Sequence, residues 1–101
     1  MYDKIVKEFS SRPRDVHTVP TTAKKPVWFY VFVEKSTVYV EGGHNNTPKS
    51  NVKKRPLKKE EYNSMLELYH KRQNGHSVSG EAHNSSHSQV YWYGIFAELK
   101  L

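Results

Sequence analysis

The chain contains no cysteine, which excludes a disulfide framework and a cysteine-ligated zinc site. It also contains no apolar run of membrane-spanning length, and the first residues, MYDKIVKEFSSRPRD, include no apolar core of a signal peptide. The mean hydropathy is low, at −0.84. We therefore expect a cytoplasmic protein that does not contact a membrane.

The motifs of common enzyme classes are missing as well. The sequence has no GxxxxGK[ST], GxGxxG or GxSxG pattern, and its acidic residues are scattered. We therefore expect no cofactor and no small-molecule substrate. Of the six histidines, His83 and His87 are four residues apart, but no HExxH motif surrounds them and two ligands do not complete a zinc site. The sequence thus predicts no bound metal.

The chain is basic and rich in aromatic residues. Its 101 residues have room for a single domain, 1–101, and aromatics at 13% offset a hydrophobic content of only 36%. Sixteen Lys and Arg against ten Asp and Glu give a net charge of +6. Such a surplus favours polyanionic partners, with nucleic acid ahead of a membrane surface.

Helix and strand patterns alternate in the first half of the chain. The spacing of apolar residues predicts a short amphipathic helix over Tyr2–Ser10. The run VWFYVFV at Val27–Val33 predicts a strand buried on both faces, and Val38–Glu41 predicts its return, so that residues 27–41 form an antiparallel hairpin. By composition, Arg12–Lys25 reads as a connector and His44–Pro56 as a loop.

The second half, about 58–99, reads as mainly helical. Lys58–Gln73 has one apolar stripe, and Asn74-Gly75 supplies a stop. The segment from 85 to 99, SSHSQVYWYGIFAEL, is ambiguous, because its aromatic run has high β propensity whereas Ser86 and Gln89 match a helix capping box. A strand stays possible, but the pattern favours a helix capped at Ser86. The fold class predicted is therefore α+β.

A resemblance appears over residues 75–91. Gly75-His76-Ser77-Val78-Ser79, Ala82 and Ser88-Gln89-Val90-Tyr91 are similar to the helix-turn-helix of resolvase-like DNA-binding domains. Ser79 can cap a short helix over Gly80–Asn84, and the order of helix, turn, short helix, turn and last helix is that of a helix-turn-helix unit, whose recognition helix the last helix would be. The resemblance implies duplex DNA as the partner, with DNA ahead of RNA.

The candidate nucleic-acid-binding residues come from charge and from that last helix. Between Glu41 and Glu60 the chain has six cations and no acid, namely Lys49, Lys53, Lys54, Arg55, Lys58 and Lys59. Such residues neutralise phosphates, although a solvated loop is the alternative. His87 and Gln89 would reach bases from the start of the last helix, although Gln89 would instead serve the cap. We expect a small non-enzymatic DNA-binding protein of bacterial or phage type, of undetermined oligomeric state.

Two alternatives remain open. A metal-independent ribonuclease of toxin type would need a histidine base and a cation, for which His44, His87 and Lys54 are candidates. A protein-interaction domain would use exposed aromatics. Trp28, Tyr30 and Phe32 alternate on one face of their strand, where they could stack on unpaired bases or form a protein interface. The favoured interpretation is that a helix covers this row as core.

Overall fold

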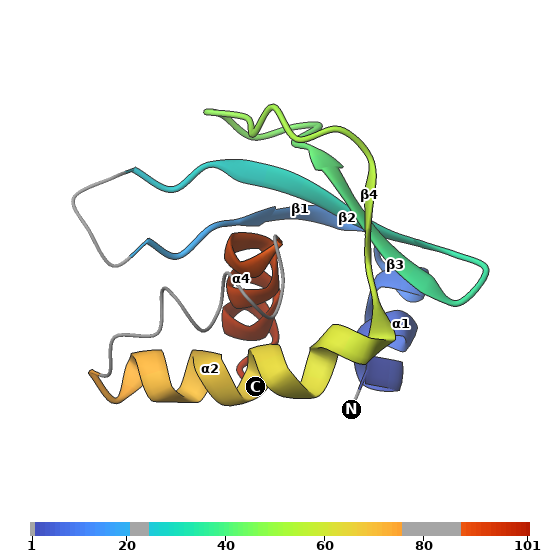
Figure 1. Cartoon of the computed structure of the whole chain (residues 1–101). Helices are drawn as coiled ribbons and strands as arrows, with labels where there is room; N and C mark the ends of the chain where they lie inside the picture. Colours follow the sequence, from blue (N-terminus) through green and yellow to red (C-terminus); the bar gives the residue numbers. More distant parts are fainter. Residues whose placement is uncertain (1, 21–24, 76–87) are drawn as a thin grey trace.

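The computed structural model describes residues 2–20, 25–75 and 88–101 (Figure 1). Their elements are helix α1 (Tyr2–Ser11), strands β1 (Arg14–His17), β2 (Trp28–Glu34), β3 (Thr37–Gly42) and β4 (Arg55–Leu57), the 3-10 helix η1 (Lys59–Glu61), and helices α2 (Tyr62–Gln73) and α4 (Gln89–Leu99). The chain is therefore an α+β protein, as its patterns predict.

The strands form one antiparallel sheet in the order β1-β2-β3-β4, so that β1 and β4 are its edges. The turn between β2 and β3 has two central residues, Lys35 and Ser36, with φ of 49° and 64°. Positive φ at both positions gives the turn whose twist matches that of the flanking strands. Helices α1, α2 and α4 all lie on the same side of the sheet (Figure 1).

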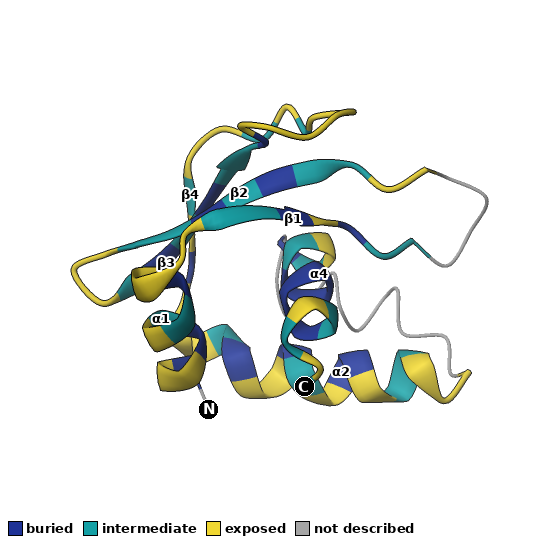
Figure 2. Cartoon of the chain, turned by 180° about the vertical axis from the view of Figure 1, so that it is seen from behind, coloured by how far each residue is buried: buried dark blue, intermediate teal, exposed yellow. Residues whose placement is uncertain are grey.

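Side chains alternate between two faces of the sheet because successive residues of a strand point to opposite sides. The inner face carries Phe29, Val31, Val38 and Val40, all at 0% exposure. Together with apolar residues of the helices they form one core, in which the largest fully buried side chains from the helices are Trp92, Phe9, Phe96, Ile5, Met65 and Ile95. Figure 2 shows that α1 and α2 each have a buried and an exposed side, whereas α4 is buried over most of its length.

Helix α4 passes very close to the sheet. A Cβ at Gly94 would lie 2.7 Å from the carbonyl oxygen of His17 and 2.9 Å from the Phe29 ring. Only glycine allows this approach, which accounts for a residue that otherwise weakens a helix interior. On its other side α4 packs against α2, and the Trp92 Nε1 donates a hydrogen bond to Glu61 Oε1 at 3.1 Å.

The first helix, the hairpin, the second helix and the helical form of the last segment are confirmed. Two short strands were missed, because the proposed connector Arg12–Lys25 contains β1 and the proposed loop His44–Pro56 contains the start of β4. Each buries a single side chain, Val16 in β1 and Leu57 in β4. A single apolar residue makes no alternation, so these strands are defined by their pairing partners.

The predicted start of the last helix is wrong. Helix α4 begins at Gln89, and its N-cap is Ser88, whose side chain makes no capping hydrogen bond. Gln89 is therefore the first helical residue and not the third position of a capping box. The proposed cap Ser86 and the proposed short helix Gly80–Asn84 lie outside the described residues.

Candidate nucleic-acid interface

The sheet face opposite the helices, which we call the outer face, carries aromatic and charged side chains. The register places them in rows across the strands: Asp15 beside Tyr30 and Tyr30 beside Glu41, then Phe32 beside Tyr39 and Tyr39 beside Pro56. Tyr30, Phe32 and Tyr39 are half-buried and belong neither to the core nor to the apolar residues packed against it. Burial in the core therefore does not account for these three rings.

In the first row, a histidine ring stacks on Tyr30. The Tyr30 and His44 ring centroids are 3.5 Å apart and the planes differ by 4°. The Nε2 of His44 lies 2.6 Å from Glu41 Oε2, the residue opposite Tyr30 on β3. The His44 and Glu41 side chains are 42% and 33% exposed, so solvent reaches both groups.

In the second row, a lysine lies over two rings. The Lys54 Nζ is 4.8 Å from the Tyr39 ring centroid and 5.8 Å from that of Phe32. It donates a hydrogen bond to Glu34 Oε1 at 2.5 Å, and this bond raises the pKa of Lys54. Each aromatic row therefore carries a cationic or basic side chain that is held by a carboxylate.

The segment after β3 is tied to the outer edge of the sheet through Asp15. Its two carboxylate oxygens accept hydrogen bonds from the backbone N–H groups of His44, Asn45 and Asn46 at 2.7–2.8 Å. Burial alone would raise the pKa of Asp15, but these three donors together lower it below its ordinary value. Further along, the backbone of Trp28 bonds to Pro48 and Ser50. The path of this segment is thus set by backbone hydrogen bonds.

The side chains of the six candidate cations do not all lie on one surface of the molecule. Lys54 lies over the outer face, whereas Arg55 donates a hydrogen bond to the Ser88 hydroxyl at 3.4 Å, at the start of α4. The remaining four, Lys49, Lys53, Lys58 and Lys59, are exposed. Lys49 bridges to Trp28 of β2, whereas Lys58 and Lys59, which follow β4, line a hollow with Thr37 of β3 and with Tyr2 and Asp3 of α1. We call Lys49, Lys53, Lys54, Lys58 and Lys59 the basic edge.

The residues proposed to read DNA from the last helix are less accessible. The Oε1 atom of Gln89 is buried and has no hydrogen-bond partner in the described part of the chain. Residues Trp92 to Phe96 of α4 are all buried. His87 and the rest of 76–87, which would form the turn of a helix-turn-helix, lie outside the described residues, so that resemblance stays a prediction.

The favoured interpretation of Trp28, Tyr30 and Phe32 as a row covered by a helix is wrong, as is burial of β2 on both faces. The helices cover the alternate residues, Phe29 and Val31. Sequence reasoning also missed Tyr39 and Glu41 as members of the surface. The signal was present, because they alternate with Val38 and Val40 in the return strand.

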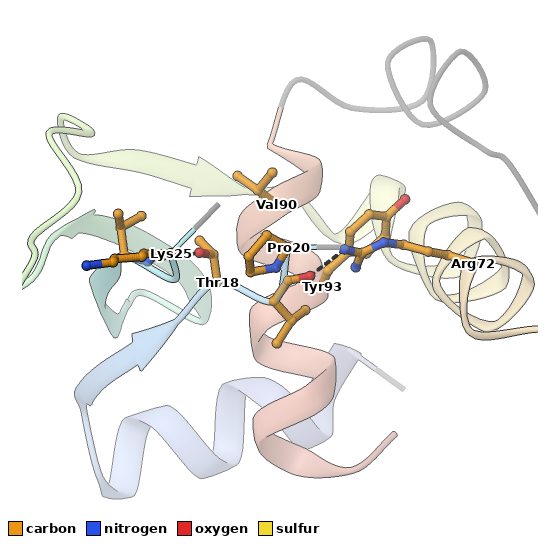
Figure 3. A pocket seen from close by; sticks show the side chains of 8 residues that line it. Thr18, Pro20, Lys25, Arg72, Val90 and Tyr93 are labelled. Carbon is orange, nitrogen blue, oxygen red and sulfur yellow. Dashed lines mark hydrogen bonds between the residues drawn. The ribbon is translucent and has the colours of Figure 1, made fainter. Parts of the chain in front are cut away.

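A hollow of about 240 Å³ lies on the helix side, between the end of α2, the start of α4, the residues that directly follow β1 and those that directly precede β2 (Figure 3). Its described lining is Thr18, Val19, Pro20, Lys25, Val27, Arg72, Val90 and Tyr93. The Arg72 guanidinium lies 4.7 Å from the Tyr93 ring centroid and donates a hydrogen bond to the Val19 carbonyl. Arg72 thereby fastens α2 to the segment that follows β1.

Within residues 2–20, 25–75 and 88–101, no three histidine, aspartate or glutamate side chains gather as a metal site. No helix in this part of the chain is both long and apolar enough to cross a membrane. No protein-family model matches the chain, and the searches of curated proteins and of solved structures found no significant match. The outer face and the basic edge are therefore the features of the molecule that bear on its function.

Proposed function

We propose that this protein binds single-stranded nucleic acid, with bases on the outer face of the sheet and phosphates along the basic edge. The observation that carries the proposal is the presence of three half-buried rings on the outer face, Tyr30, Phe32 and Tyr39, which alternate with core residues along β2 and β3. Aromatic side chains on such a surface stack on unpaired bases, each at roughly 1–3 kcal/mol, with little dependence on sequence.

The charge beside the rings supports the same partner. Exposed lysines precede and follow β4 in the chain, and β4 lies beside Tyr39 through the Tyr39–Pro56 pair, so a strand of nucleic acid could lay its backbone near these lysines while its bases turn toward the rings. Lysines that neutralise phosphates release counterions, which adds affinity that falls with salt. Net charge alone favours any polyanion, but a charged edge next to aromatic rings favours one with unpaired bases.

Binding of duplex DNA, as the sequence predicts it, would use α4 instead of the outer face. Reading of a duplex by α4 would require exposed side chains at the start of that helix, where Gln89 has a buried amide oxygen. Bases within a duplex are stacked on one another, so they could not use the outer face. The two hypotheses therefore predict opposite preferences between single strands and duplexes.

Fluorescence anisotropy with labelled oligothymidylate, oligouridylate and a duplex of equal length tests the proposal. Tyr39→Leu should weaken single-strand binding roughly 5- to 150-fold, because a stacking ring is lost. The matched control is Tyr39→Phe, which keeps the ring and should bind like the unsubstituted protein. Equal affinity of Tyr39→Leu, or a clear preference for the duplex, would contradict the proposal.

The basic edge has its own test in a salt series. Lys53→Gln should weaken binding to all single strands alike and reduce the slope of log affinity against log salt by about 0.7. Lys4→Gln on α1 removes the same charge from the helix side and should leave the slope unchanged. RNA should be checked for integrity in the same samples, since cleavage that His44→Ala abolishes would favour the ribonuclease alternative.

A further inference from the structure

The stack of His44 on Tyr30 has the form of a bound base. A flat nitrogen heterocycle lies parallel to the Tyr30 ring at 3.5 Å, and a nitrogen at its edge lies 2.6 Å from the Glu41 carboxylate. Proteins hold unpaired bases by the same two contacts, a ring beneath the base and a hydrogen-bonding group at its edge. The imidazole therefore fills a position with the chemistry of a nucleobase site.

Of the two carboxylates beside Tyr30, only Glu41 is available to a ligand. Asp15 accepts three backbone N–H bonds with its two oxygens, and these bonds fix the path of the chain. Glu41 faces a side chain, the imidazole of His44, and is one-third exposed. A ligand that replaces the imidazole would leave the Asp15 contacts intact.

The His44 side chain can leave without unfolding the segment that carries it. Its backbone N–H stays bonded to Asp15, so rotation about the side-chain torsions is enough to clear the Tyr30 ring. The imidazole contacts Tyr30 and Glu41, and 42% of the side chain is already exposed. A base that offers better versions of both contacts can therefore replace it.

Guanine offers both. Its N1–H and N2–H groups are adjacent donors on the Watson–Crick edge and can bond both oxygens of one carboxylate, in the paired manner that also makes arginine–carboxylate contacts strong. Adenine, cytosine and uracil or thymine each place an acceptor beside their donor, which a carboxylate repels. We infer that Tyr30 and Glu41 form a guanine site that His44 occupies in the absence of nucleic acid, an inference that rests on the proposed function.

Anisotropy titrations of short oligothymidylates with one central guanine, one central inosine or thymine throughout test the inference. Inosine lacks the N2 amino group, so it keeps the stack and loses one of the two hydrogen bonds. Guanine should bind about tenfold more tightly than thymine, with inosine between them. Glu41→Gln should erase this preference, because the amide presents one oxygen and one N–H group to the two guanine donors in place of two oxygens.

Two further variants separate this site from general effects. Glu34→Gln makes the same change at the carboxylate that holds Lys54, and it should keep the guanine preference. His44→Ala removes the competing ring and should tighten binding of the guanine strand severalfold. Weaker binding by His44→Ala would overturn the inference, since the imidazole would then belong to the binding surface.

The titrations distinguish failure of the guanine site from failure of the proposed single-strand binding. Binding of all three oligonucleotides with equal affinity would overturn the guanine site and leave the proposed function standing. A guanine preference that persists in Glu41→Gln would also overturn the guanine site and leave the proposed function standing, because a group other than Glu41 would then recognise the base. Failure of the unsubstituted protein to bind any of the single strands would overturn both.

Discussion

On the inner face of the sheet, Phe29, Val31, Val38 and Val40 carry no polar atom and are fully covered by the helices. On the outer face, the same two strands present rings that are half-buried and lie under tethered side chains, His44 over Tyr30 and Lys54 over Tyr39. Core packing explains the inner residues completely. Core packing does not explain the outer residues, because the helices do not cover them. The outer face is therefore the candidate binding surface.

The contrast is tested most strongly by truncating one phenylalanine on each face. Phe29→Ala should lower the free energy of unfolding by about 3–5 kcal/mol, because it removes a fully buried ring and leaves a cavity. Urea unfolding followed by tryptophan fluorescence measures it. Phe32→Ala should cost clearly less, since that ring is half-buried. Equal losses would show that the outer face is core after all.

The close approach of α4 to the inner face gives the next effect. Gly94→Ala should destabilise the protein by about 1–3 kcal/mol, because the added methyl group would meet the His17 carbonyl and the Phe29 ring. Thermal unfolding measures the loss. Gly75→Ala is the comparison, since no atom of the described residues lies within 4 Å of a Cβ placed there and its φ of 87° opposes a side chain at about 1–2 kcal/mol. A neutral Gly94→Ala would mean that α4 lies further from the sheet.

The pH dependence of stability tests the outer edge through Asp15. Its folded-state pKa lies below the ordinary value of 3.8, so the ionised group stabilises the fold above that pH. This stability is lost as the pH falls through the lowered pKa. Asp15→Asn should cost about 1 kcal/mol at neutral pH and flatten the acid part of the stability curve. Some slope should persist because the hydrogen bond from Arg12 also lowers the pKa of Glu8.

The smallest effect concerns the pair over the second aromatic row. Lys54 and Glu34 are each 49% exposed, so a double-mutant cycle with Lys54→Gln and Glu34→Gln should give a coupling close to zero that salt reduces further. Single-strand affinity should fall with Lys54→Gln but not with Glu34→Gln. A coupling well above zero would make the pair a structural element of the sheet.

Elements with a strong local pattern were predictable. Helix α1 has its apolar residues on one stripe, α2 is followed by Asn74 and by Gly75 with φ of 87°, and the two hairpin strands are β-branched or aromatic at most positions. Strands β1 and β4 were not predictable, because RDVH and RPL each contain one buried apolar residue. A short polar segment becomes a strand when a neighbouring strand satisfies its backbone, and the sequence does not record that neighbour.

The candidate site divides in the same way. A cluster of basic residues is visible in the sequence, but the directions of its side chains are not. Lys54 lies over the Tyr39 ring, whereas the side chain of its neighbour Arg55 bonds to Ser88 at the start of α4. The partnership of Tyr30 with Glu41 and His44 joins residues of β2, β3 and the segment after β3. The sheet register sets that contact, which no spacing along the chain encodes.

By itself the sequence determined the class of fold and the basic character that favours a polyanion, and it favoured a helix over a strand for the last segment. It could not determine which face of β2 is buried. Odd- and even-numbered residues of the run Trp28-Phe29-Tyr30-Val31-Phe32-Val33 point to opposite faces, and both sets are apolar or aromatic, so either face could pack into a core. The tertiary structure decided it by placing α1 and α4 against Phe29 and Val31, which leaves Tyr30 and Phe32 on the other side. That choice is what creates a candidate binding surface.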